Sequence, residues 1–237
     1  GVMLLTENQE QQAQEALNTA LNLDPKNQAA LFSRGQMRLK SKPPLLDGAI
    51  KDLSALRDVD PNHIEARVSL AEALRDQGRL DEAAKELDEA LKRAPERRDI
   101  RINLAGAYAA MKPPLWAEAE KVIQEGERSE PKVVVWKRME ARLLASRNLN
   151  EKAVLKIREA LALDPQNGEV FRDYLELLEG GKYWAQLMAE VERAFTADPK
   201  LAQSGWWAYV KRAVALSNTG HKKEGMADFV KAMELVQ

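Results

Sequence analysis

The sequence predicts an all-α solenoid built from repeated helix–turn–helix units, and three observations lead to this fold class. Prolines recur every 34 or 36 residues, at Pro25, Pro61, Pro95, Pro131, Pro165 and Pro199. Small or apolar residues stand twelve, eight and five residues before each proline, which places them on one face of a helix. Turn residues such as Gly78 separate this helix from an earlier amphipathic segment. Self-similarity at a fixed period of this length is typical of a repeat architecture.

Each unit is therefore expected to contain two helices. Ala49, Leu53 and Leu56 mark the second helix of one unit, and the proline that follows ends it because proline lacks a backbone N–H and clashes with the preceding turn. Leu70 and Leu74 mark the first helix of the next unit. Glycine or asparagine turns join the two helices within a unit.

Two of the units are longer by two residues, and both carry the insertion in the same internal turn. The segments are Lys42-Pro43-Pro44-Leu45 and Lys112-Pro113-Pro114-Leu115. Consecutive prolines favour an extended, stiff backbone. We interpret these segments as rigid elbows within a duplicated two-repeat block, in preference to a dedicated binding motif.

The unit resembles the tetratricopeptide repeat (TPR), and the resemblance covers essentially the whole chain. That family has small residues at positions 8, 20 and 27, larger apolar residues at 4, 7, 11 and 24, and proline at 32. Position 8 is matched by Gly35, Ala71, Ala105 and Ala141. Departures from the pattern, which make local packing harder to predict, are Arg38 at position 11 and Arg67, Arg101 and Lys137 at position 4. The resemblance implies a right-handed superhelical solenoid of TPR units.

The register divides the chain into one array of repeats. We expect a truncated repeat over residues 1–27, full repeats over 28–63, 64–97, 98–133, 134–167 and 168–201, and a last repeat over 206–237. A linker around Lys200–Gly205 precedes the last repeat. Because Gly1 falls inside a first helix and the chain stops where a closing proline would stand, we expect a segment of a longer protein.

The composition excludes several classes of site. There is no cysteine, which excludes disulfides, thiolate metal sites and a cysteine nucleophile. His63 and His221 are far apart in the sequence and are expected to be exposed turn residues, so we predict no metal site. The formal net charge of −1 argues against a nucleic-acid partner bound through global basicity. No apolar run approaches the ~20 residues of a membrane span.

The sequence also lacks catalytic and cofactor motifs. No phosphate-binding glycine loop occurs. The carboxylates of Glu86, Asp88 and Glu89 alternate with Lys85 and Lys92 at helical spacing, which is typical of a solvated, ion-paired face. We therefore predict no enzyme activity and no cofactor. The absence of cysteine is compatible with cytoplasm and periplasm alike, so no compartment is predicted.

The resemblance implies that first helices line a concave groove in which a peptide or protein partner binds. The groove residues that we single out are Phe32, Gln36, Val68, Glu72, Asn103, Gly106, Arg138, Arg142 and Arg172. By analogy with groove asparagines of the family, Asn103 is expected to bond an extended peptide backbone. The three arginines form a positive patch suited to carboxylates. Equally, the nearby Glu169, Asp173 and Glu176 would neutralise them internally.

The tryptophans divide into two groups. Trp116, Trp136 and Trp184 occupy positions at which packing between helices is expected. Trp206 and Trp207 are adjacent, so they point in different directions on a helix and cannot both enter one core. Either one of them contacts a partner, or both pack at the end of the array.

The leading functional hypothesis is a non-catalytic scaffold for protein–protein interaction. One alternative is a self-assembly module that forms homo-oligomers through the array ends, where Met226, Phe229 and Met233 lie. Another is the regulatory arm of a larger enzyme, and an RNA-binding helical repeat is disfavoured by the mixed charge. TPR domains that hold acidic chaperone tails need basic and asparagine side chains where this chain has Val68 and Glu72, so we predict no binding of that kind.

Overall fold

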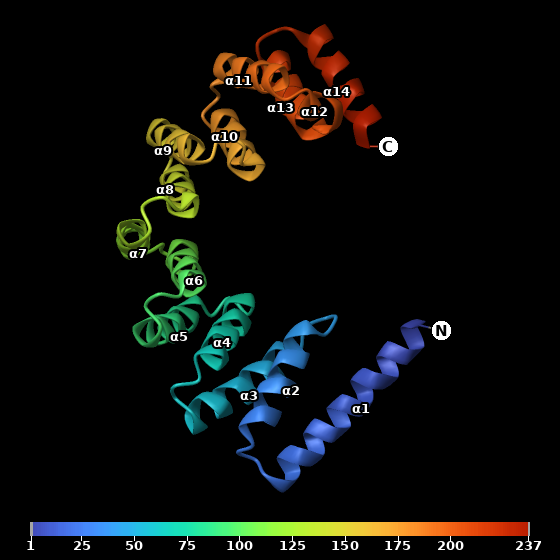
Figure 1. Ribbon diagram of the computed structural model, residues 1–237, viewed down its shortest axis with the longest axis vertical. Coiled ribbons are helices and arrows are strands. Elements are labelled where there is room, and N and C mark those ends of the chain that lie inside the picture. Colours follow the sequence, from blue (N-terminus) through green and yellow to red (C-terminus); the bar gives the residue numbers. More distant parts are fainter. Residues whose placement is uncertain (1, 237) are drawn as a thin grey trace. The chain divides into compact units, whose positions relative to one another are not determined.

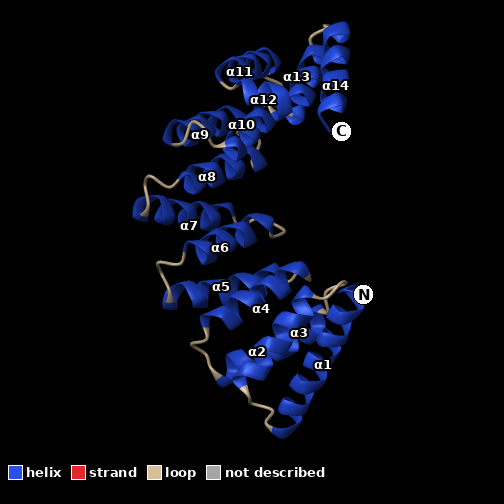
Figure 2. Cartoon of the chain, turned by 45° about the vertical axis from the view of Figure 1, so that its right-hand side comes forward, coloured by secondary structure: helices blue, strands red, loops and turns tan. Residues whose placement is uncertain are grey.

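The computed structural model describes residues 2–236, with side chains described at residue 9 and from residue 11 to residue 236. Gly1, which the register places inside a first helix, lies outside the described residues. Within the described residues every regular element is an α-helix (Figure 2). The helices are α1 (Val2–Leu23), α2 (Gln28–Lys40), α3 (Leu46–Val59), α4 (Ile64–Asp76), α5 (Leu80–Arg93), α6 (Arg98–Ala110), α7 (Trp116–Ser129), α8 (Val134–Ser146), α9 (Asn150–Leu163), α10 (Gly168–Gly180), α11 (Trp184–Ala197), α12 (Pro199–Ser204), α13 (Trp206–Asn218) and α14 (Lys222–Val236).

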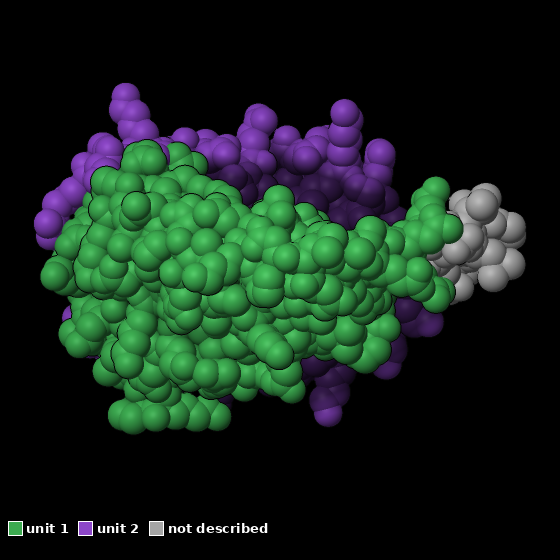
Figure 3. Space-filling model, turned by 90° about the horizontal axis from the view of Figure 1, so that it is seen from below, with its two compact units in different colours: residues 1–126 green, residues 127–237 purple. Residues whose placement is uncertain are grey.

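The chain divides into two compact units, residues 1–126 and residues 127–237, with the boundary inside α7 (Figure 3). In the first unit α2 packs on α3 and α4 packs on α5, and contacts of α3 with α4 and of α5 with α6 join successive hairpins (Figure 1). In the second unit α8 packs on α9 and α13 packs on α14, with α9 against α10 and α11 against α13. The expected all-α solenoid of helix–turn–helix units is confirmed.

The core of the first unit follows the apolar pattern of the sequence. Ala49, Leu53 and Leu56 of α3 are completely buried. Gly35 on α2 is required for the close approach of this hairpin, because a Cβ atom at Gly35 would lie 2.8 Å from Cγ of Leu53. Burial of such residues is the main source of stability for a repeat that packs only on its neighbours.

The core of the second unit is built around larger side chains. Trp136 and Tyr174 are buried, and the indole Nε1 of Trp136 donates a hydrogen bond to Glu130 at 3.2 Å. Trp184 is partly buried against this cluster, which also contains Leu187. The packing role expected for Trp136 and Trp184 is confirmed, and Trp116 is half-buried at the start of α7.

The basic residues that depart from the TPR pattern form defined contacts between helices. Arg67 donates to the carbonyl of Pro61 at 3.0 Å and pairs with Glu86 of α5. Arg101 repeats this arrangement one unit later, donating to the carbonyl of Pro95 at 2.8 Å and pairing with Glu125. Each guanidinium thus joins a first helix to the preceding turn and to its own second helix. Lys137 occupies the same position in α8 and pairs with Glu127 at 2.7 Å and Glu159 at 2.8 Å.

The segment expected to be a linker around Lys200–Gly205 is instead the short helix α12. Asp198 caps this helix by accepting the N–H of Lys200 at 3.0 Å, and Pro199 lies in its first turn. Proline is well tolerated at this position because its missing N–H is not needed there. Pro199 therefore begins a helix, in addition to following the end of α11.

Two turns also differ from expectation. The Pro-Pro segments are not simply extended, because the N–H of Leu45 bonds the carbonyl of Arg38 at 2.9 Å and the N–H of Leu115 bonds that of Tyr108 at 3.0 Å, so each turn doubles back. Both Lys-Pro peptide bonds are cis.

The expectation that His63 is an exposed turn residue is wrong, because its ring is half-buried and its Nδ1 accepts the N–H of Ala66 at 3.2 Å as the N-cap of α4.

Candidate functional site

The candidate site lies on the first helices of the first unit. α2, α4 and α6 each contain 13 residues, and α2 and α4 begin at a side-chain cap. Residues at the same place in these helices therefore occupy equivalent positions. We call the surface that carries Phe32, Gln36, Val68, Glu72, Asn103 and Gly106 the first-helix face of the first unit. These are the fifth and ninth residues of α2 and of α4, and the sixth and ninth residues of α6.

A pocket of about 180 Å³ opens on this face between α4, α5 and α6. Its lining residues are Val68, Ala71, Glu72, Arg75, Ala83, Leu87, Asn103 and Ala107. Three of them, Val68, Glu72 and Asn103, are groove residues singled out from the sequence. The structure thus brings these three together, whereas the contribution of Leu87 from a second helix was not foreseen, because the sequence pattern assigned it only to the core.

The polar groups of the pocket differ in whether they have partners. Among the described residues, the side chains of Glu72 and Asn103 make no hydrogen bond or ion pair. Arg75 is bound to the carboxylate of Asp76, with Nε and Nη2 each 3.1 Å from Oδ1. An asparagine side chain supplies both a donor and an acceptor, and a glutamate supplies acceptors with a negative charge. The pocket therefore presents unused hydrogen-bonding capacity beside aliphatic walls.

Elsewhere on this face, some side chains already have partners within the chain. Gln36 donates a hydrogen bond to Ser69, which joins α2 to α4. Phe32 is half-buried, with its ring centroid 5.1 Å from that of His63. Gly106 is exposed, and a Cβ atom there would meet no other atom within 4 Å. The surface next to the pocket is therefore open.

Two groove residues of the second unit, Arg138 and Arg142, are held in ion pairs. Arg138 bonds Asp173 and also contacts Glu169 at 2.6 Å, and Arg142 donates to Asp173 at 2.8 Å. Burial raises the pKa of Asp173, but hydrogen bonds from both arginines outweigh it and hold this pKa below its usual value. Of the two interpretations left open by the sequence, internal pairing describes Arg138 and Arg142 in this structure, through Glu169 and Asp173.

The side chains of Trp206 and Trp207 point in different directions, as expected for adjacent residues on a helix. Trp206 is 46% exposed. Trp207 is partly buried, with Phe171 at a centroid distance of 6.0 Å and the guanidinium of Arg172 at 4.9 Å from its ring. Arg172 therefore contacts an aromatic face of its own chain, which leaves Trp206 as the exposed aromatic ring of this pair.

A second hollow of about 560 Å³ lies between α1 and α2 and was not predicted. It is lined by Gln11, Gln14, Ser33, Gln36, Met37, Arg38, Lys40, Ser41 and Leu45. The glutamines of α1 are the only sequence feature that could have pointed to this hollow. That α2 forms its other wall is evident only from the fold.

Among the described residues, no group of three or more histidine, aspartate or glutamate side chains is placed to hold a metal ion. In this same part of the chain, no helix combines the length and the apolar character that crossing a bilayer requires.

A family model and a solved structure both relate this chain to tetratricopeptide repeat proteins. The tetratricopeptide repeat family model matches residues 46–98 and 74–143. The chain is similar to the crystal structure of a tetratricopeptide repeat protein from Parabacteroides merdae, with 18% identity and a TM-score of 0.70 over 99% of this chain and 90% of that one. No curated protein sequence matches the chain.

Two further solved structures share the fold. A thermophilic TPR protein of Thermus thermophilus is 21% identical, with a TM-score of 0.51 over 75% of this chain and 95% of that one. YrrB, described as a TPR protein with an unusual peptide-binding site, is 13% identical, with a TM-score of 0.50 over 79% of this chain and 93% of that one.

Proposed function

We propose that this chain, whose residues 46–98 and 74–143 match the tetratricopeptide repeat family model, is a non-catalytic scaffold that binds a peptide or protein segment along its first helices. The observation that carries the proposal is the pocket between α4, α5 and α6, with unpartnered Glu72 and Asn103 on its rim. A partner that fills this pocket gains hydrogen bonds without breaking any within the chain.

The pocket is held in place by the core beneath it. Leu70 and Ala71 of α4, Leu87 of α5 and Leu104 of α6 are buried, so the three helices are fixed by packing that is independent of a partner. A site that exists before binding has a smaller ordering cost than a site that forms on binding. The conformational entropy lost on binding then comes mainly from the partner, as it does when a flexible peptide binds in an extended form.

The size of the pocket suits part of a polypeptide. At about 180 Å³ it lies below the roughly 300–1,000 Å³ of sites that enclose small molecules. It is large enough for one side chain, while open surface at Gly106 leaves room for the adjoining backbone. YrrB, which shares this fold, is described as having a peptide-binding site, and this supports a peptide as the class of ligand.

The test is selection of random twelve-residue peptides by phage display on the wild-type chain, followed by affinity measurement with the Gly106→Phe variant. Because Gly106 is surrounded by open space, a phenylalanine there covers the face without disturbing the core. We expect selected peptides to lose at least about tenfold in affinity, or 1.4 kcal/mol. Gly168→Phe, at another glycine with open space around it, is the matched control and is expected to bind normally.

Two results would contradict the scaffold proposal. The first is a wild-type chain that enriches no peptides over an unrelated helical protein. The second is a set of peptides that bind Gly106→Phe and the wild-type chain equally, which would place their site on another surface.

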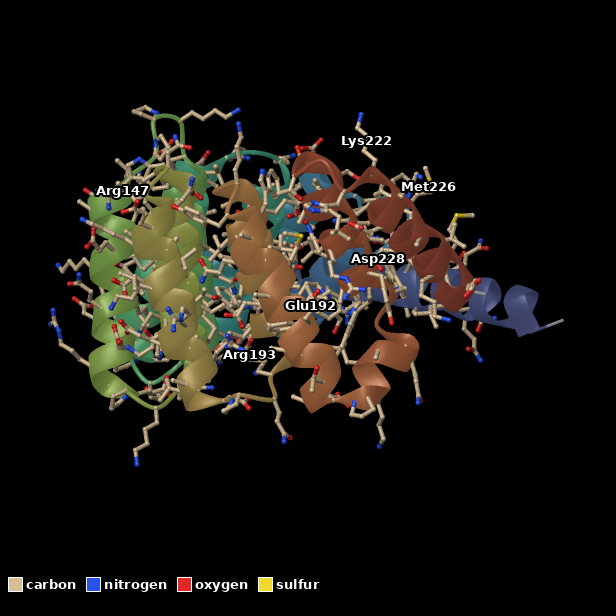
Figure 4. All side chains as sticks on the ribbon, turned by 90° about the horizontal axis from the view of Figure 1, so that it is seen from above. Arg147, Glu192, Arg193, Lys222, Met226 and Asp228 are labelled. Atoms are coloured by element: carbon tan, nitrogen blue, oxygen red, sulfur yellow. The ribbon has the colours of Figure 1, made fainter. Side chains whose placement is uncertain are left out.

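A second candidate function is self-assembly through α14. Met226, Val230 and Met233 lie on one side of this helix and are 64%, 50% and 69% exposed. Figure 4 shows Met226 projecting from the outer side of α14, whereas Asp228 lies on the side toward α13, where it binds Arg212 at 2.7 Å. An exposed apolar stripe of this kind is typical of an interface.

Sedimentation velocity over a range of concentrations tests this second function. A self-assembling chain is expected to show a concentration-dependent shift to larger species, and the double variant Met226→Lys/Met233→Lys is expected to remain a monomer. Lys222→Met, which adds an apolar side chain at an exposed position of the same helix, serves as the control. A wild-type chain that is monomeric at all concentrations would eliminate self-assembly.

A further inference from the structure

Two steps between first helices are joined through the same pair of positions. At each, the ninth residue of one first helix bonds the sixth residue of the next. Between α2 and α4 this pair is Gln36 and Ser69, which share a hydrogen bond. Between α8 and α10 it is Arg142 and Asp173, which form an ion pair at 2.8 Å. At both steps the two side chains satisfy each other.

The equivalent pair between α4 and α6 is Glu72 and Asn103, and here the two side chains do not bond each other. They line the same pocket instead. The α4–α6 step is thus open, whereas the α2–α4 and α8–α10 steps are closed. A carboxylate at this position needs a donor, and none of the described side chains supplies one.

The charges around the pocket leave Glu72 without a counter-charge. The cation in the pocket, Arg75, is bound to Asp76. A second cation, Arg97 at the N-cap of α6, is shared between Glu65 and Asp99 at 2.6 Å each. Glu72 itself therefore forms no ion pair, and its carboxylate is available to a cationic ligand, whereas the cation of the pocket is already paired.

The walls suit a side chain that is apolar along its length and charged at its tip. Val68, Leu87 and Ala107 supply aliphatic surface, and Glu72 and Asn103 supply acceptors. Lysine and arginine side chains combine an aliphatic stem with a cationic head in this way. The volume of about 180 Å³ far exceeds the roughly 10–15 Å³ that one water needs, which fits a long side chain.

We propose that the pocket between α4, α5 and α6 receives a lysine or arginine side chain of the bound peptide, with Glu72 as its counter-ion and Asn103 as an added hydrogen-bond acceptor. This assignment rests on the proposed function, because it names the chemistry of the ligand at the same site. The recognised class is a basic peptide segment. Acidic segments are rejected, because they would place a second negative charge beside Glu72.

The experiment uses the random twelve-residue display library on the full chain in three forms: wild type, Glu72→Gln and Glu176→Gln. Glu176 is the ninth residue of α10, is exposed and lies outside the pocket, so its variant makes the same charge change at the same helix position. Selected peptides are then synthesised with the basic residue unchanged or replaced by citrulline or norleucine. Thermal unfolding followed by circular dichroism verifies that the variants are folded.

We expect the wild type and Glu176→Gln to enrich peptides that contain lysine or arginine at one fixed place. Glu72→Gln is expected to lose this enrichment and to bind the selected peptides about tenfold more weakly. Replacement of the basic residue by citrulline or norleucine is expected to weaken binding to the wild type by a similar factor and to leave binding to Glu72→Gln almost unchanged.

Two results would overturn the inference while leaving the scaffold proposal standing. One is enrichment of peptides without a fixed basic residue, and the other is equal affinity of wild type and Glu72→Gln for the selected peptides. If the wild-type chain enriches no peptides at all, the scaffold proposal fails and the basic pocket fails with it.

Discussion

Substitution of Asp52 by asparagine is expected to destabilise the first unit strongly, because this carboxylate joins two helices. Asp52 on α3 is 1% exposed. It accepts hydrogen bonds from Nε and Nη2 of Arg34 at 2.8 and 2.6 Å, and a further one from Arg38. Both arginines lie on α2. Asparagine has the same shape but carries no charge, and its amide group adds donors where the guanidinium groups need acceptors.

The magnitude follows from the burial of the three side chains. Three hydrogen bonds to charged partners at about 1.5–3 kcal/mol each set an upper limit of several kcal/mol. The arginine side chains keep 17% and 20% exposure, so water compensates part of the loss. We expect the free energy of unfolding of the first unit to fall by about 3 kcal/mol, at the lower end of values for breaking a buried ion pair.

The assay is urea unfolding followed by circular dichroism at the helical band. Tryptophan fluorescence reports mainly on the second unit, which contains Trp136, Trp184, Trp206 and Trp207, whereas the first unit contains Trp116 alone. Asp58→Asn is the matched control, because Asp58 lies on the same helix and pairs with Arg57 while largely exposed. This control is expected to change stability by less than about 0.5 kcal/mol. Equal stabilities of Asp52→Asn and Asp58→Asn would refute the reasoning.

Three other outcomes are expected. Gly35→Ala places a Cβ atom 2.8 Å from Leu53, so urea unfolding should show a loss of about 1–3 kcal/mol, and an unchanged midpoint would contradict the packing argument. Gly106→Ala, in open space on α6, should raise stability by about 0.5–1 kcal/mol in the same assay, since alanine favours the helix. Because the pKa of Asp173 is lowered in the folded state, its stabilisation is present above the unfolded pKa and is lost as pH falls through the folded value. Fluorescence-detected unfolding between about pH 5 and pH 2 should therefore show a smaller acid destabilisation for Asp173→Asn than for the wild type, and parallel curves would exclude this role.

Much of the fold could be predicted from local sequence, because each repeat buries residues at fixed offsets from its proline. Ala49, Leu53 and Leu56 illustrate this, since their spacing alone places them in the core. The helix at Pro199 was missed because proline both follows a helix and starts one, and the period of the array favoured the first interpretation. The role of His63 as a cap depends on backbone geometry that its residue type does not specify.

The candidate site was predictable only in part. The register placed Val68, Glu72 and Asn103 on one surface, and the structure brings them to one pocket. Which groove residues have partners could not be read from the sequence, because pairing depends on the distance between successive helices. Arg142 and Glu72 are both the ninth residue of their helices, yet the first is held by Asp173 and the second has no partner among the described residues.

The recurring pair between first helices has a consequence for how such a protein diversifies. At Gln36–Ser69 and at Arg142–Asp173 the two side chains bond each other, and at Glu72–Asn103 they line a pocket. Exchanging the members of such a pair changes what the surface offers and leaves the apolar core residues unchanged. The double substitution Glu72→Arg/Asn103→Asp would place the arginine–aspartate pair of the α8–α10 step between α4 and α6. A step whose pair is closed gains stability and a step whose pair is open offers a binding site, so ligand preference and folding stability are linked at these two positions.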